Sequence, residues 1–154
     1  MKSLPLLCVI ALLVGAAAQS EHGAGNLATN ERFVGAWKLV SIEEPGADGQ
    51  LHKADCDGMF VFTPDGKASV QVMYRNAESA SAYAHSGYEA SYGSYHIDDD
   101  STFTFHVDGA LVRTLIGTDL RRAYKISGDR LTIQSTNPNE HWRVIWERFS
   151  AAGT

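Results

Sequence analysis

The residues best able to do chemistry lie on one face of a predicted strand over residues 119–126. The sequence alternates there, so Leu120, Arg122, Tyr124 and Ile126 share a face. Because the other members of this face are apolar or aromatic, Arg122 should point into the protein. A buried guanidinium keeps its charge and must be paired or hydrogen-bonded. Arg122 and Tyr124, the next residue on the same face, are therefore predicted ligand-binding residues. Arg122 would donate two hydrogen bonds to a carboxylate or phosphate of the ligand. The alternative is that Arg122 pairs with an internal carboxylate or stacks on an aromatic ring.

A second candidate comes from the predicted strand over 88–97, where Tyr95 shares a face with Ile97. We expect Tyr95 to face inward. Its phenol would orient a polar group of the ligand, or it would fill the core with its hydroxyl hydrogen-bonded.

His106 is the natural acid or base if it reaches an interior. It alternates with Phe105 and Val107 and shares a face with Thr104, which favours the surface and leaves a polar cavity wall as the alternative. His96 and His106 flank the acidic turn at 98–100, which we interpret as solvated. No pair of histidines has the spacing of a metal site, and there is no phosphate loop or dinucleotide fingerprint, so neither metal nor cofactor is predicted.

These residues need strands to position them, and almost the whole chain has strand character. Alternation and turn signals such as Thr63-Pro64-Asp65-Gly66 predict eight strands, near 33–43, 58–63, 67–74, 88–97, 101–107, 119–126, 129–135 and 141–149. Residues 76–85 are predicted to form a short helix that covers one end of the fold, or else a surface turn. The sequential order of strands favours a single, all-β, antiparallel up-and-down eight-stranded barrel over a β-sandwich.

The N-terminus has the pattern of a secretory signal. Lys2 is followed by an apolar stretch and by small residues up to Ala18, where cleavage is expected. A membrane anchor is the alternative, but the stretch is short for a span. We therefore predict a signal peptide over 1–18, a flexible lead-in over 19–31 and the barrel domain over 32–150. The mature protein would be secreted or periplasmic, with no membrane span.

The net charge limits the possible partners, and the cysteine content bears on thiol reactivity. The mature chain would carry a formal charge of −6 and no basic tract, which argues against nucleic acid as a partner. Cys56 would be its one cysteine. Because Asp55 and Asp57 flank it, the pKa of its thiol should be high and its reactivity low. The oligomeric state does not follow from the sequence.

Several short motifs, in this order, resemble the bacterial lipocalin-like domain family from about residue 33 to residue 149. They include Gly35-Ala36-Trp37-Lys38-Leu39-Val40-Ser41, Phe62-Thr63-Pro64-Asp65-Gly66 and Trp146-Glu147-Arg148. The resemblance implies a barrel with a cavity, and some relatives of related barrel shape are isomerases or cyclases acting on hydrophobic substrates.

The resemblance also assigns roles to particular residues. It implies that Arg148 packs across Trp37 to close the barrel, and it makes Gln71 a cavity candidate. The chain departs from the family where Ser91 and Phe105 stand, positions that often hold Tyr and His. If those positions line the cavity, it is more apolar on that side.

Together these observations predict an exported lipocalin-like protein that binds a small hydrophobic molecule, including a carboxylated one, inside its barrel. The predicted ligand-binding residues are Arg122, Tyr95, Tyr124, Gln71 and His106, and the barrel-closure residues are Trp37 and Arg148. A barrel enzyme, with Tyr95 or His106 moving a proton in an isomerase or cyclase, is the alternative, and a binding protein is favoured over an enzyme. A third alternative is a barrel that its own side chains fill.

Overall fold

The computed structural model describes residues 30–78 and 81–150, and in this part the chain forms antiparallel strands with little helix. A helical turn at 30–33 precedes the first strand. The remaining elements are β1 (Gly35–Pro45), β2 (Leu51–Lys53), β3 (Cys56–Phe62), β4 (Lys67–Tyr74), β5 (Tyr88–Ile97), β6 (Thr102–Ala110), the 3-10 helix η1 (Arg113–Leu115), β7 (Asp119–Ser127), β8 (Arg130–Ser135) and β9 (Arg143–Arg148).

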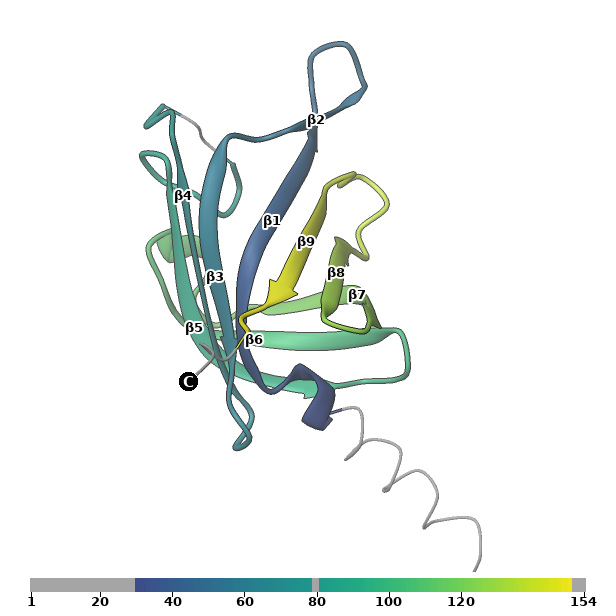
Figure 1. The fold of residues 1–154 in the computed structure, drawn as a ribbon. Coiled ribbons are helices and arrows are strands. Elements are labelled where there is room, and N and C mark those ends of the chain that lie inside the picture. The colour runs from purple at the N-terminus through teal and green to yellow at the C-terminus, as the bar shows by residue number, and fades with distance from the viewer. Residues whose placement is uncertain (1–29, 79–80, 151–154) are drawn as a thin grey trace, which may run out of the picture.

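The strands close into a barrel (Figure 1). From β3 to β9 each strand pairs with the next along the chain, β3 pairs with β1, and β1 also pairs with β9. The strand β2 pairs only with the end of β1, from Glu43 to Pro45, and stands outside the ring. The predicted all-β, up-and-down eight-stranded barrel is thus confirmed. Closure leaves the barrel no free strand edge.

Two segments lie outside the predicted strands. The strand β2 was not predicted, because three exposed residues show no alternation. The described residues of 76–85 form turns and bends and no helix, which is the surface-turn alternative. Instead, Asn76 accepts a hydrogen bond from the backbone N–H of Glu78, and the Ser81 hydroxyl accepts those of Tyr83 and Ala84. Such local bonds compete with helical ones.

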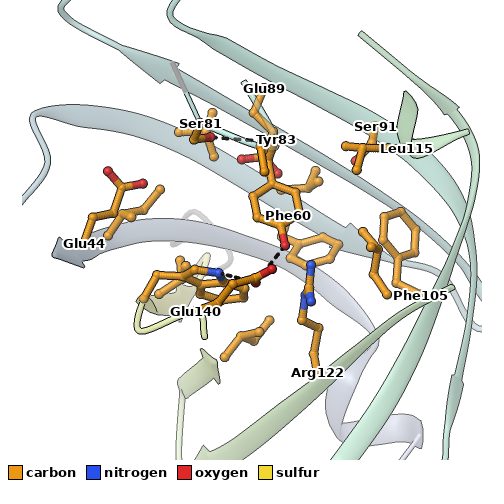
Figure 2. A pocket seen from close by; sticks show the side chains of 18 of the residues that line it. Glu44, Phe60, Ser81, Tyr83, Glu89, Ser91, Phe105, Leu115, Arg122 and Glu140 are labelled. Atoms are coloured by element: carbon orange, nitrogen blue, oxygen red, sulfur yellow. Dashed lines mark hydrogen bonds between the residues drawn. The ribbon is translucent and has the colours of Figure 1, made fainter. Parts of the chain in front are cut away.

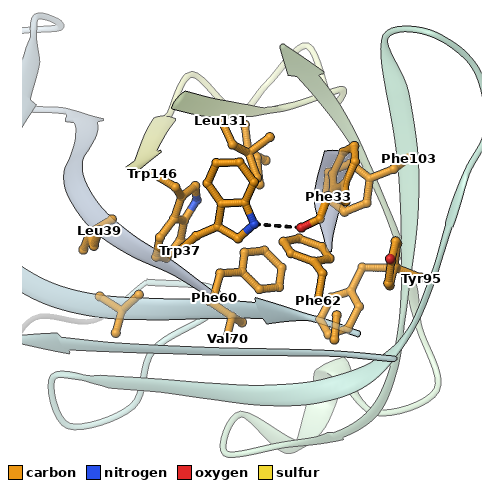
Figure 3. Packing of buried hydrophobic residues seen from close by; sticks show 14 of the residues in the cluster. Phe33, Trp37, Leu39, Phe60, Phe62, Val70, Tyr95, Phe103, Leu131 and Trp146 are labelled. Atoms are coloured by element: carbon orange, nitrogen blue, oxygen red, sulfur yellow. Dashed lines mark hydrogen bonds between the residues drawn. The ribbon is translucent and has the colours of Figure 1, made fainter. Parts of the chain in front are cut away.

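One end of the barrel is filled by aromatic side chains (Figure 3). Phe33, from the helical turn, is fully buried among them, with its ring centre 5.2 Å from that of Phe62 and 4.7 Å from that of Tyr124. The indole N–H of Trp37 donates to the Phe33 carbonyl at 2.8 Å, which ties the turn to β1. The turn therefore acts as a plug for this end.

A β-bulge divides β1 into two parts. The register with β9 shifts between Leu39 and Ser41, so the interior holds Trp37 and Leu39 before the bulge and Ile42 and Glu44 after it. A bulge adds one residue to a strand and so reverses its alternation. Glu44 consequently reaches the interior.

The predicted signal peptide (1–18) and all but the last two residues of the predicted lead-in (19–31) lie outside the described residues. Within 30–78 and 81–150, no helix has the length and apolar character needed to cross a membrane.

Candidate ligand cavity

A cavity of about 260 Å³ lies inside the barrel, next to the aromatic cluster. Phe60, Phe103 and Trp146 belong to both, so the cluster forms its floor. The remaining wall is mostly aliphatic and aromatic, with the polar side chains gathered in a few places (Figure 2). The apolar lining includes Ile42, Val70, Val72, Phe105, Leu115, Leu120, Ile133 and Val144. The third alternative required an interior completely filled by the protein's own side chains. The cavity shows that the interior is not filled in this way.

Among the described residues, Arg122 is the one arginine that lines this cavity. Its guanidinium carbon lies 5.1 Å from the ring centre of Tyr83 and 5.0 Å from that of Trp142. It donates a hydrogen bond of 3.3 Å to the Arg121 carbonyl. Within the described residues no carboxylate oxygen lies within 4.0 Å of its nitrogens. The guanidinium is thus held by aromatic faces and keeps donors for another molecule.

Glu140 fixes the two rings that hold Arg122 (Figure 2). One of its carboxylate oxygens accepts both the Tyr83 hydroxyl and the Trp142 indole N–H, each at 3.0 Å. Burial acts to raise the pKa of Glu140, but hydrogen bonding to Ser135, Trp142 and Tyr83 and the charge of Arg122 outweigh it and lower the pKa. Glu140 is therefore ionised at neutral pH and already engaged.

Two further carboxyl groups line the cavity. Glu44 accepts the Tyr74 hydroxyl at 3.2 Å. Glu89 makes no side-chain hydrogen bond with any other residue that the structure describes, although it is only partly exposed. Burial, aided by the charge of Glu44 and opposed by that of Arg122, raises the pKa of Glu89 to about 7. Near neutral pH this side chain is thus divided between its acid and its carboxylate.

Of the five predicted ligand-binding residues, the structure places Arg122 in the cavity and the other four outside its lining. Tyr95 does face inward, but it is 5% exposed, packs in the aromatic cluster and donates its hydroxyl to the Thr63 carbonyl at 3.1 Å. The ring of Tyr124 packs against Phe33, and its hydroxyl donates to the Asp99 carbonyl. Both tyrosines lie among the aromatic residues that fill the closed end, which for Tyr95 is the core-filling alternative, and neither lines the described cavity.

Gln71 and His106 point away from the interior. Gln71 is exposed on β4, because the inward positions of that strand are the even-numbered ones, and it accepts the Tyr88 hydroxyl at 3.4 Å. His106 lies on the outer face of β6, 2.7 Å from a carboxylate oxygen of Asp119. This is the surface placement that its alternation favours.

The predicted closure pair lies at the seam between β1 and β9. Trp37 is fully buried, and the guanidinium carbon of Arg148 lies 4.2 Å from its ring centre. Arg148 also donates to the carbonyls of Val34 and Arg32, at 2.6 Å and 2.7 Å. The arginine thus joins the last strand, the first strand and the helical turn.

Sequence reasoning missed most of the polar cavity residues, although the alternation of the strands placed some of them on an inward face. Glu89 alternates in phase with Tyr95, which was predicted to face inward, and Glu140 and Trp142 continue the inward phase of Trp146. Tyr83 comes from an irregular segment with no periodic signal. Ser91 and Phe105, the two positions where the chain departs from the family, both line the cavity.

The described residues hold no group of three or more His, Cys, Asp or Glu side chains placed to bind a metal ion.

The sequence profile described as the lipocalin-like domain matches residues 34–149. No curated protein matches the chain. Solved structures resemble it at low identity. A lipocalin-like protein from Bacteroides uniformis is 16% identical, with a TM-score of 0.48, over 77% of this chain and 99% of its own. An uncharacterized protein from Bacteroides eggerthii is 14% identical, with a TM-score of 0.46, over 76% and 99%. A mutant of the fluorescent protein UnaG is 12% identical, with a TM-score of 0.40, over 79% and 99%. With three quarters of its length matched by the profile, the chain belongs to the lipocalin-like domain family.

Proposed function

We propose that this protein is exported, with its signal peptide cleaved near Ala18, and that it binds a small hydrophobic molecule with an anionic group inside its barrel. The observation that carries the proposal is the position of Arg122, a permanent cation inside an apolar cavity with no carboxylate partner within 4.0 Å among the described residues.

The shape and chemistry of the cavity support a ligand of this kind. Small-molecule sites are concave and mostly apolar, with a few polar groups that fix orientation. Here the apolar body of the ligand would be buried against Phe60, Phe105 and Ile133. Its carboxylate, sulfonate or phosphate would accept hydrogen bonds from Arg122, whose planar donors suit a two-oxygen acceptor.

The anchor can be tested with 2-naphthoate, a fluorescent two-ring acid, and with its neutral methyl ester. We expect the acid to bind more tightly than the ester, and Arg122→Gln to weaken binding of the acid at least tenfold. Arg121→Gln is the matched control, because Arg121 is the next residue, lies on the exposed face of β7 and carries the same charge. Circular dichroism of each variant checks that it folds. Retention of wild-type affinity by a folded Arg122→Gln variant would overturn the anchor role.

The natural ligand is accessible through native mass spectrometry of the protein purified from its host, with a denatured sample as control. A stoichiometric hydrophobic acid would support the proposal. N-terminal sequencing of the same material tests export, since cleavage near Ala18 is expected and an intact Met1 would contradict it.

A barrel enzyme of the isomerase or cyclase type is the second candidate. The observation in its favour is that two tyrosine–carboxylate pairs line the cavity, Tyr74 with Glu44 and Tyr83 with Glu140. Paired titratable groups are a feature of acid–base sites. The two candidate functions differ in whether the bound molecule is released unchanged or chemically altered. A binding protein releases its co-purified molecule unchanged, whereas an enzyme incubated with it in D2O yields a rearranged or deuterated product.

A further inference from the structure

Glu89 places an acceptor inside the cavity that no described residue satisfies. It lies at the start of β5 on the inward face, one inward position from Ser91. Neither side chain makes a side-chain hydrogen bond with any other residue of the described part of the chain, and both line the cavity. Figure 2 shows Glu89 and Arg122 coming from different walls. The wall of β5 therefore presents a polar strip that is separate from the guanidinium.

The other two carboxyl groups of the cavity already accept hydrogen bonds from described residues. Glu44 accepts the Tyr74 hydroxyl, and Glu140 accepts from Tyr83 and Trp142. A buried carboxyl group without donors is costly, and this cost is relieved when a donor is supplied. Among the residues that the structure describes, Glu89 is thus the one carboxyl group of the cavity that accepts no hydrogen bond from another side chain.

The charges of the cavity also disfavour a ligand that is only an anion. Among the described residues, three carboxyl groups and one guanidinium line the cavity, and charges interact more strongly in its largely apolar surroundings than in water. A ligand group that donates a hydrogen bond, or that carries positive charge, would offset this excess near Glu89.

We propose that Glu89 is a second recognition group, and that the ligand is a hydrophobic molecule with an anionic group for Arg122 and a separate hydroxyl, amide N–H or amine for Glu89. This inference rests on the proposed function, because it places the anionic end of the ligand at Arg122.

Selectivity follows from the same chemistry. A site built around a buried hydrogen-bonding group rejects an analogue that lacks the matching partner, because the group is then left unpaired. A hydroxyl or amino group on the ligand should therefore improve binding more than a methyl ether of the same size.

Four probes test this inference: 2-naphthoate and its 6-hydroxy, 6-amino and 6-methoxy derivatives. All carry the same acid and the same rings, and they differ in whether the far end donates a hydrogen bond. We expect the 6-hydroxy and 6-amino acids to bind at least tenfold more tightly than the 6-methoxy acid. In Glu89→Leu this preference should fall to threefold or less. Glu147→Gln, on the exposed face of β9, is the control and should keep the preference.

The outcomes separate the two proposals. If 2-naphthoate binds through Arg122 but donor and methoxy probes bind alike, or the preference persists in folded Glu89→Leu, the role of Glu89 is overturned and the anchor stands. If none of the four acids binds at millimolar concentration, the anionic anchor fails and the inference fails with it. Should Glu89→Leu not fold, Glu89→Gln serves instead, since its amide retains one acceptor oxygen and should reduce the preference in part.

Discussion

Arg148 and Trp37 are register partners across the β1–β9 seam, with the guanidinium of one stacked on the ring of the other. The contact lies where the first and last strands meet, and the same guanidinium caps the carbonyls of Val34 and Arg32. One side chain therefore holds both the closure of the barrel and the turn that plugs it.

Arg148→Ala should reduce stability while leaving the cavity itself intact. The loss of a desolvated cation–π contact and of two charged hydrogen bonds predicts a decrease of about 2–4 kcal/mol in the free energy of unfolding. Urea denaturation measures it, and Arg130→Ala, at an exposed position of β8, is the control. Below the unfolding transition, 2-naphthoate affinity should remain within about threefold of wild type. A variant of full stability would contradict the closure role.

Glu140→Gln should strengthen the binding of an anionic probe. The amide keeps an oxygen that can accept from Tyr83 and Trp142, so the rings around Arg122 stay in place, while the negative charge near the anchor is removed. We expect 2-naphthoate to bind about two- to fivefold more tightly at low salt, with a smaller gain at high salt because the site is partly open to solvent. Fluorescence titration at two salt concentrations measures both. Weaker binding by this variant would show that the carboxylate does more than hold the rings.

Glu89→Gln should change how stability depends on pH. The pKa of Glu89 rises from its ordinary value of 4.5 to about 7 in the folded protein, through burial and Glu44 and against the effect of Arg122. Between these values the folded state binds more protons than the unfolded state, so the contribution of Glu89 to stability is complete below pH 4.5 and is lost as the pH rises through 7. Tyr74 also faces Glu89 but stays protonated throughout this range, because burial raises the pKa of its phenol.

Glutamine has no such loss, so the stability of Glu89→Gln relative to wild type should increase by about 1–3 kcal/mol between pH 5 and pH 8. Urea denaturation at both pH values measures this difference. For the control variant Glu147→Gln, the free energy of unfolding should change between the two pH values as it does in the wild type. An unchanged difference between the two pH values would show that Glu89 is not a buried titrating group.

Cys56 should react slowly in the folded protein. Burial, together with Glu44, Asp57 and Asp55, raises the pKa of its thiol from 9.0 to about 11. Only the thiolate reacts, so at pH 8 its fraction should be about 100-fold lower than in the unfolded chain. The rate of reaction with Ellman's reagent, with and without urea, checks this expectation. Similar rates in the two conditions would contradict it.

The strands of the barrel could be predicted from the sequence because alternation is a local property. Segments such as 67–74 and 88–97 were placed at the bounds that the structure has. The first strand was expected from residue 33, whereas β1 starts at Gly35 and Phe33 belongs to the helical turn. Its aromatic character is the same in both settings, so the pattern alone does not separate a strand residue from a plug.

The cavity was harder to predict because it depends on where the filled part of the barrel ends. Tyr95 and Tyr124 face the interior, yet the packing of Phe33 assigns them to the closed end. Alternation indicates which side chains point inward and does not indicate their depth. Tyr83 reaches Arg122 from an irregular segment, so its contact is decided by tertiary structure alone.

The bulge in β1 also limits what alternation can show. Extending the phase of Trp37 and Leu39 places Glu43 inside, whereas the structure places Glu44 there and pairs Glu43 with Arg143. The extra residue at the bulge thus places Glu44 in the cavity and leaves Glu43 outside it, the reverse of what continuous alternation predicts.

This shift has a consequence for how the family could diversify. Before the bulge, the odd-numbered positions of β1 support the barrel, and after it the even-numbered positions line the cavity. Substitutions at Ile42 or Glu44 can therefore change the cavity wall without altering Trp37, the residue of β1 at the closure seam. Within one continuous strand, the residues that support the closed barrel and those that line the cavity thus occupy separate sets of positions.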